Sequence, residues 1–353
     1  MPRWVATAPG KIVLLGEYAV LEGAPALVQA VDRRCRVELV HCQDADCRIE
    51  APQLGIPPVR FRVDDRARLN WQEAVPAPFA RTAALIESVL GYIAECGGRP
   101  GPFRMRVDTA ELFDGSGQDA VKLGLGSSAA TAVAIDAVLR AAFLEGGRKE
   151  TDFEIVSRLL QPGRKAQGNA GSGIDLAASL CGGLLGYRIR DERIEIRPLS
   201  LPGEIKTCFV WAGEPASTAE LLTAWRRSRE QHPREHGRLL GEMQTVASAG
   251  LEAVERGDVQ EILACWSDYG EIMGKMNDLV GCEIVTAEHR IAGGLAELLN
   301  GVYKPCGAGG GDLGMAASLD SRFRSRMRHL CRQAGLKTLP LRPSEQGVRV
   351  TTE

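Results

Sequence analysis

Two serines and a lysine stand in a glycine-rich motif where they could bind phosphate groups. The motif KLGLGSSAAT covers residues 122–131 and runs directly into an apolar helical pattern. Glycines permit a left-handed backbone, and a helix start presents unpaired N–H groups and the positive end of its dipole. These features together make an anion site, to which Ser127 and Ser128 could add hydroxyl ligands for phosphate or metal. A glycine turn with either serine as an ordinary N-cap explains the motif equally well.

Three further motifs carry Lys11, Asp175 and a second glycine run. APGKIVLLGEY, residues 8–18, places Lys11 in an apolar strand, where it must meet a carboxylate or an anionic substrate unless the strand is an exposed edge. GNAGSGIDLAA, residues 168–178, places Asp175 at a helix start, where an N-cap is the simplest role. KPCGAGGGD, residues 304–312, has few side chains for packing, so we expect a backbone or ligand to approach it closely. The Walker pattern GxxxxGK[ST] does not occur.

Apolar periodicity predicts an element order that changes character in the middle of the chain. The first part is expected to hold strands at 12–16, 26–32, 35–40 and 103–112, helices at 81–94, 127–143 and 153–160, and a hairpin at 182–198. A Pro/Gly-bearing boundary follows at 199–203. The second part is expected to hold strands at 207–213, 315–319 and 338–342, and helices at 217–230, 235–256, 258–274, 283–299 and 320–334. We therefore expect two domains, residues 1–200 and 201–353, the second of α+β type.

The composition excludes several classes of protein. The 353 residues are 44% hydrophobic and 25% charged with a net charge of -2, which gives no basic footprint for nucleic acid. The ten cysteines are scattered without a CxxC pair, which favours free thiols in a reducing compartment. No apolar run reaches the length of a membrane span, and the N-terminus does not resemble a signal peptide. We expect a soluble cytoplasmic protein that binds neither membrane nor nucleic acid.

Lysine is scarce in this chain. Basic charge is carried by 35 arginines and only eight lysines, a bias that we attribute to genome composition. The scarcity makes each lysine more informative. Lys11, Lys122 and Lys304 all fall inside or beside glycine motifs.

The four motifs, in this order over about residues 5–318, resemble those of the GHMP kinase superfamily. The resemblance implies a two-domain α+β fold: an N-terminal ribosomal-protein-like α/β domain binds ATP and packs on a ferredoxin-like α+β C-terminal domain, with ATP and acceptor between them. It makes Asp175 the catalytic aspartate and Lys11 the strand lysine that pairs with it. It places these residues at ATP: Gly124, Leu125, Gly126, Ser127, Ser128, Ala129, Gly309 and Gly310. Ser128 would also contact Mg²⁺.

Within that superfamily the details are similar to the phosphomevalonate kinase branch. Residues 16–18 read GEY where mevalonate kinases and galactokinases usually have GEH, and Lys122 could bind the extra phosphate of the acceptor. The resemblance suggests these acceptor contacts: Tyr18, Ser172, Gly173, Ser217, Thr218 and Gly311. For Ser217 and Thr218 an N-cap role explains the sequence equally well. Residues 163–165 lack the histidine that many relatives have there, and the arginines at 226, 227 and 229 favour a solvated face over a phosphate clamp.

The expected activity is transfer of the ATP γ-phosphoryl group to the phosphate of 5-phosphomevalonate, giving the diphosphate on the mevalonate route to isoprenoids. Lys11, Lys122 and Asp175 would be catalytic, with charge neutralisation and positioning as the main contributions. The alternatives are a mevalonate kinase or another small-molecule kinase of the superfamily, in which Asp175 is a base for a hydroxyl, and a non-catalytic sensor of ATP and a metabolite. The decarboxylase branch is disfavoured, because its motif around the aspartate differs. We expect a monomer or a homodimer.

Overall fold

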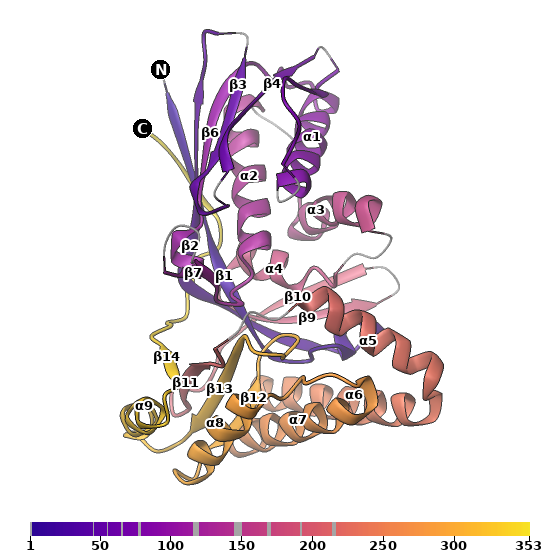
Figure 1. The fold of residues 1–353 in the computed structure, drawn as a ribbon, viewed down its shortest axis with the longest axis vertical. Helices are drawn as coiled ribbons and strands as arrows, with labels where there is room; N and C mark the ends of the chain where they lie inside the picture. The colour runs from indigo at the N-terminus through magenta and orange to yellow at the C-terminus, as the bar shows by residue number, and fades with distance from the viewer. Residues whose placement is uncertain are drawn as a thin grey trace. The chain divides into compact units, whose positions relative to one another are not determined.

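The protein consists of two compact units, each assembled from separate stretches of the chain (Figure 1). This computed structural model describes residues 2–44, 46–54, 56–64, 66–76, 79–115, 120–144, 150–167, 171–190, 193–213 and 217–353. The first unit holds Met1–Lys11, Ala30–Gly182 and Ser344–Glu353, and the second holds Ile12–Gln29 and Gly183–Pro343. The long strands β1 (Arg3–Leu15) and β2 (Ala26–His41) contribute residues to both. The division into domains 1–200 and 201–353 stays a prediction.

The first unit contains a sheet whose neighbouring strands are far apart in sequence. Its order is β15-β1-β2-β6-β3-β4-β5, with β3 (Cys47–Ala51), β4 (Ile56–Val63), β5 (Leu69–Trp71), β6 (Phe103–Asp108) and β15 (Arg349–Thr352). Only the β3–β6 pair among those with a described register is parallel. Strand β6 alternates buried Phe103, Met105 and Val107 with exposed arginines, the period of two that a half-buried strand requires.

Four helices of the first unit pack on one another. They are α1 (Ala80–Glu95), α2 (Ser127–Phe143), α3 (Asp152–Gln167) and α4 (Ile174–Cys181), with contacts α1–α2, α1–α3, α2–α4 and α3–α4. Helix α2 is alanine-rich because it is largely buried, and small side chains allow its neighbours to approach. Its one buried carboxylate, Asp136, is paired with Arg158 of α3 at 2.6 Å. The two short strands β7 (Phe113–Asp114) and β8 (Val121–Lys122) precede the glycine loop.

The second unit combines a hairpin, a four-stranded sheet and five helices in the described residues. Strands β9 (Leu184–Arg190) and β10 (Arg193–Leu199) form the predicted hairpin, whose turn at 191–192 lies outside the described residues. The antiparallel sheet has the order β12-β13-β11-β14, with β12 (Val302–Pro305), β13 (Leu313–Ser318), β11 (Lys206–Trp211) and β14 (Lys337–Leu339). The helices are α5 (Thr218–Gln231), α6 (Pro233–Arg256), α7 (Val259–Val280), α8 (Ala287–Glu297) and α9 (Phe323–Gln333).

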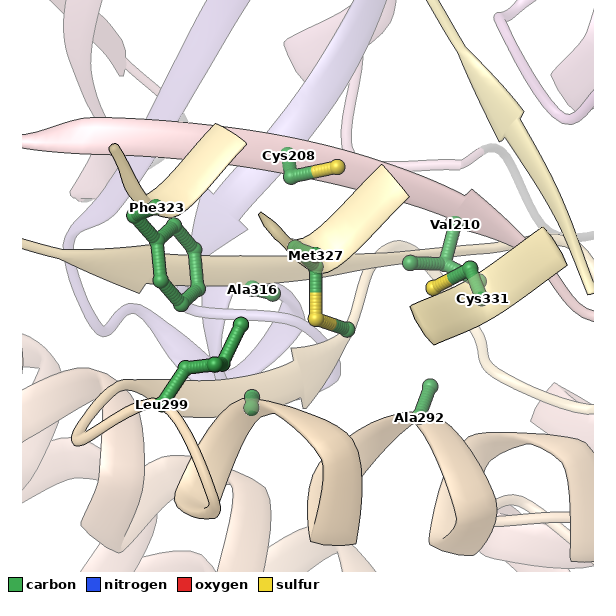
Figure 2. Packing of buried hydrophobic residues seen from close by; sticks show 9 residues of the cluster. Cys208, Val210, Ala292, Leu299, Ala316, Phe323, Met327 and Cys331 are labelled. Atoms are coloured by element: carbon green, nitrogen blue, oxygen red, sulfur yellow. The ribbon is translucent and has the colours of Figure 1, made fainter. Parts of the chain in front are cut away.

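Helices α8 and α9 cover this four-stranded sheet with a small apolar core. Figure 2 shows Phe323, Met327 and Cys331 of α9 beside Cys208 and Val210 of β11, with α8 and its following turn completing the cluster. These residues recur at intervals of four along α9, which places them on one helical face. Strand β13 lies inside the sheet and is buried along its whole length.

Two of the chemical expectations can be compared with the structure directly. All ten cysteines are free, as the absence of a CxxC pair suggested. Among the described residues, no helix combines the length and the apolar character that a membrane span needs.

Candidate active site

The glycines of residues 124–126 fold the chain into the start of α2. Gly124 and Gly126 adopt φ values of 71° and 73°, and Gly126 is the N-cap, its carbonyl accepting the N–H groups of Ala129 and Ala130 at 3.1 Å each. The alternative in which Ser127 or Ser128 caps the helix is therefore wrong. In the described part of the chain the N–H groups of these two serines have no backbone acceptor. They are the donors that an anion bound at this helix end would take.

Lys11 reaches this loop from β1. Its backbone N–H donates to Leu125 O at 2.9 Å, and its aliphatic stem crosses Gly126 so closely that a Cβ there would lie 2.9 Å from Lys11 Cε. A Cβ on Gly10 would lie 2.7 Å from Leu125 O. Strand and loop can touch only because both positions are glycine. The structure thus brings Lys11 against the loop, a contact that the sequence motifs did not predict.

The ammonium group of Lys11 has no counter-charge among the residues that the structure describes. Lys11 is half-buried, and no carboxylate in the described ranges forms an ion pair with it, Asp175 included. Of the partners expected for this lysine, a carboxylate is not found among the described residues, and an anionic substrate stays a prediction.

Lys122 stands at the entrance of the same loop. It is exposed at the end of β8, opposite Phe113 of β7. Leu123 and Leu125, one on each side of Gly124, are both 1% exposed and anchor the loop in the first unit. Lys122 therefore precedes the loop as a solvated cation on a fixed backbone.

Asp175 lies in the first turn of α4. The N-cap is Gly173, with φ 81°, and its carbonyl accepts the N–H of Ala177 at 3.0 Å. The N-cap role for Asp175 is therefore wrong. The Oδ1 atom of Asp175 accepts the N–H of Leu176 at 3.1 Å, which leaves Oδ2 for another partner. The side chain is half-buried, Ser172 Oγ accepts the N–H of Ile174 at 3.4 Å, and α4 packs on α2. The motif residues 168–170 lie outside the described residues.

The second unit brings Tyr18 to the C-terminal glycine loop. Gly307, Gly309, Gly310 and Gly311 all have positive φ, so only glycine fits this backbone without strain. Tyr18 Oη donates to the carbonyl of Ala308 at 2.5 Å. On the other side of the loop, Gly310 N–H donates to Ile284 O at 2.8 Å, and a Cβ on Gly309 would lie 2.4 Å from that oxygen.

A buried ion pair supports the same loop. Lys304 Nζ lies 2.5 Å from Glu17 Oε1, and this oxygen also accepts the N–H of Gly307 at 3.3 Å. Lys304 is 0% exposed and Glu17 4%. Burial raises the pKa of Glu17, while the charge of Lys304 and its hydrogen bond act in the opposite direction. The sequence analysis assigned no role to either residue. Glu17 and Lys304 are 287 positions apart, so no local pattern indicates that they pair.

Ser217 and the arginines of α5 have structural explanations. Ser217 is the N-cap of α5, and its Oγ accepts the N–H of Glu220 at 3.4 Å, so the N-cap alternative holds for this residue. Thr218 is the first helical residue and is exposed. The arginines at 226, 227 and 229 are exposed, as a solvated face requires, and Arg229 pairs with Glu22 at 3.5 Å. The side chains at 163–165 lie outside the described residues.

Comparisons with known proteins place these motifs in a family. Residues 84–183 match the family model described as GHMP kinases N terminal domain. The chain is 32% identical to a phosphomevalonate kinase of Streptomyces sp. (strain CL190) over 378 residues, covering 98% of each chain. It is 28% identical to a mevalonate kinase of Thermococcus gammatolerans over 360 residues, covering 99% of this chain and 98% of that one.

A solved structure is similar in fold over nearly the whole chain. It is that of Streptococcus pneumoniae phosphomevalonate kinase in complex with phosphomevalonate and AMPPNP, with a TM-score of 0.78 and 20% identity. The match covers 96% of this chain and 99% of that one. The likeness in fold therefore includes both compact units.

Proposed function

The chain belongs to the GHMP kinases, has their two-domain α+β fold and is a phosphotransferase; on that premise we propose that it transfers the γ-phosphoryl group of ATP to the phosphate of 5-phosphomevalonate. The contact of Lys11 with Gly126 carries the proposal, because a cation that pairs with no described carboxylate lies there against a loop suited to phosphate. The 32% identity to a phosphomevalonate kinase, against 28% to the mevalonate kinase of Thermococcus gammatolerans, favours this acceptor.

The N-terminus of α2 is proposed as the site of the ATP phosphates. Gly124 and Gly126 have positive φ, which turns the backbone inward before α2. The N–H groups of Ser127 and Ser128 follow this turn and are the available donors. The neighbouring Leu125 and Ala129 are buried and fix the backbone on either side. The glycines at 309 and 310 are proposed to border the nucleotide without donating through Gly310, whose N–H is already bound.

Magnesium is proposed to accompany ATP. In the part of the chain that the structure describes, no three His, Cys, Asp or Glu side chains gather to hold a metal. Mg²⁺ keeps several waters and binds largely through substrate phosphates, and in P-loop NTPases a serine or threonine hydroxyl is one of its protein ligands. The exposed hydroxyl of Ser128, one residue into α2, is the proposed protein ligand. When bound, the ion neutralises charge on the phosphates.

Lys11, Lys122 and Asp175 are proposed to act on the reacting groups. An acceptor phosphate oxygen forms a bond to the γ-phosphorus while the bond from that phosphorus to the departing ADP oxygen breaks. The acceptor is already an anion at neutral pH, because a phosphate monoester has a second pKa of ~6. The two lysines reduce repulsion between the phosphates, and Asp175 Oδ2, which Leu176 does not occupy, takes any residual proton.

Six residues are proposed to contact the acceptor, because the resemblance to the family suggests them. They are Tyr18, Ser172, Gly173, Ser217, Thr218 and Gly311. The roles of Tyr18 and Ser217 are the most constrained, since Tyr18 Oη is bound to Ala308 and Ser217 Oγ caps α5. Tyr18 would therefore present its ring rather than its hydroxyl. A cytoplasmic location and a monomeric or homodimeric state belong to the same proposal.

A mevalonate kinase is the second candidate, because mevalonate kinases also match the chain over nearly its whole length. In that reaction Asp175 would be the base for a hydroxyl. ADP release is measured with ATP–Mg²⁺ and mevalonate, 5-phosphomevalonate, galactose or homoserine offered separately. Turnover of 5-phosphomevalonate alone supports the proposal, and turnover of mevalonate but not of its phosphate refutes it. Binding of ATP without turnover of any acceptor indicates a sensor.

A further inference from the structure

The C-terminal glycine loop, residues 307–311, cannot fix its own shape. Four of its five residues are glycine, all four have positive φ, and none has a side chain to pack. Glycine loses more conformational freedom on ordering than any other residue. The described contacts that hold the loop therefore come from elsewhere in the second unit: the side chains of Glu17 and Tyr18, and the carbonyl of Ile284.

Glu17 and Tyr18 act on consecutive loop residues. Glu17 Oε1 accepts the N–H of Gly307, and Tyr18 Oη donates to the carbonyl of Ala308. These two residues are themselves fixed, because Tyr269 Oη of α7 donates to the backbone carbonyl of Glu17 at 2.6 Å. Tyr18 has a φ of 61°, a left-handed conformation that costs free energy in a residue other than glycine. The strained turn aims both side chains at the loop.

Lys304 holds the carboxylate of Glu17 in this position. Its Nζ donates to Glu17 Oε1 at 2.5 Å and to the carbonyl of Pro305 at 2.6 Å, two residues before the loop. The ion pair is not optimal for the stability of the fold, because Glu17 Oε2 is buried with no hydrogen-bond partner among the described residues. An apolar pair of similar volume often stabilises a protein as well as a buried ion pair. The observed arrangement therefore points to a requirement for geometry.

We propose that Lys304 and Glu17 are a positioning pair for phosphoryl transfer, which together with Tyr18 sets the conformation of the glycine loop at residues 307–311. Neither member of the pair needs to touch a substrate. Lys304 acts through Glu17, and Glu17 acts through the Gly307 N–H. The expected effect on kcat rests on the proposed role of this loop beside the nucleotide. The expected effect on the conformation of the loop does not depend on that role.

The test is the double variant Glu17→Gln/Lys304→Met, which removes both charges and so leaves no unpaired buried ion. Its matched control is Tyr303→Phe, one position away on β12, which breaks the hydrogen bond of 2.7 Å between Tyr303 Oη and His289 Nδ1 and leaves the loop contacts intact. Thermal unfolding, kcat and KM for ATP, and hydrogen exchange at residues 307–311 are measured for both. Misplacing reacting groups by about 1 Å costs up to ~100-fold in rate.

We expect the double variant to fold, to exchange the loop amides faster than the wild type and to lose about 10- to 100-fold in kcat. Tyr303→Phe is expected to keep kcat within about twofold and leave loop exchange unchanged. Loop exchange and kcat both at wild-type level in a folded double variant overturn the proposal. Should the double variant not fold, Glu17→Asp replaces it: this change keeps the charge pair but withdraws the carboxylate from Gly307 N–H, and unchanged exchange and kcat then overturn the proposal. A wild type that turns over no acceptor refutes the proposed function, and loop exchange alone then decides.

Discussion

Replacing Gly126 by alanine should have two effects: strain in the backbone at a positive φ, and displacement of the Lys11 side chain. The φ of 73° places alanine in the left-handed region, which costs about 1–2 kcal/mol, partly offset by about 0.4–1 kcal/mol of lost unfolded-state freedom. The net loss of unfolding free energy is therefore about 1 kcal/mol. In addition, the new Cβ would lie 2.9 Å from Lys11 Cε and 3.0 Å from Lys11 Cγ, so the lysine stem must move. A displacement of about 1 Å in its ammonium group is expected to lower kcat by about 10- to 100-fold.

Gly257→Ala is the matched control for this experiment. Gly257 is the C-cap of α6, has a φ of 71°, and a Cβ there meets no atom within 4 Å. It therefore reproduces the backbone strain without the contact to Lys11. Urea unfolding should give similar losses for both variants, whereas ADP release should slow only in Gly126→Ala. Equal kcat in the two variants would refute the argument that Gly126 positions Lys11.

Three further changes have expected outcomes. Asp175→Asn and Lys11→Met should each lower kcat by about 100-fold or more while ATP still binds, measured by ADP release and equilibrium titration; near-normal turnover in both contradicts the assigned roles. Burial lowers the pKa of His289 to about 4, below its ordinary 6.5. As the pH falls, His289 is therefore protonated in the unfolded state before it is protonated in the folded state. The free energy of unfolding should be highest above pH ~6.5 and should fall by about 3 kcal/mol by pH ~4. Urea titrations across this range should show a flatter profile in His289→Gln, and an unchanged profile contradicts the assignment. Arg34 donates to Thr7 O at 3.0 Å, to Gln346 O at 3.1 Å and to Gly347 O at 2.5 Å, so Arg34→Ala should release the C-terminal segment and cost about 2–3 kcal/mol in urea unfolding. Resistance of that segment to carboxypeptidase equal to the wild type's would show that Arg34 does not hold it.

Local patterns predicted the helices well where their own residues determine them. The helix expected at 127–143 is α2 over the same residues, and the one expected at 81–94 is α1 at Ala80–Glu95. The helix expected at 153–160 instead runs as α3 from Asp152 to Gln167, with Pro162 inside it. A proline inside a helix costs about 3 kcal/mol, but packing on α1 and α4 can exceed that cost. A breaker residue is a local preference, which tertiary contacts can override.

Pairings between distant segments were beyond the sequence pattern. Strand β15 pairs with β1, which places Thr352 opposite Trp4. Strand β12 was not predicted, because its four residues include a lysine and a proline. Lysine and glutamate are rarely buried, so Lys304 and Glu17 gave no reason to expect a buried contact. The motifs indicated which loops could bind substrates. The contact between Lys304 and Glu17, which supports the C-terminal loop, depends on tertiary structure that local patterns do not predict.

The motif glycines are required for two different physical reasons, and one of them meets both. Gly124 and Gly173 are needed for positive φ just before α2 and α4, where helix N–H groups become available. Gly10 is needed for space alone, because a Cβ would press on the carbonyl of Leu125. Gly126 needs both the conformation and the space, since it is an N-cap and is crossed by Lys11. A glycine pattern is therefore informative about chemistry only where the freed space is filled by a functional group, and at Gly126 that group is a lysine without a protein counter-charge in the described chain.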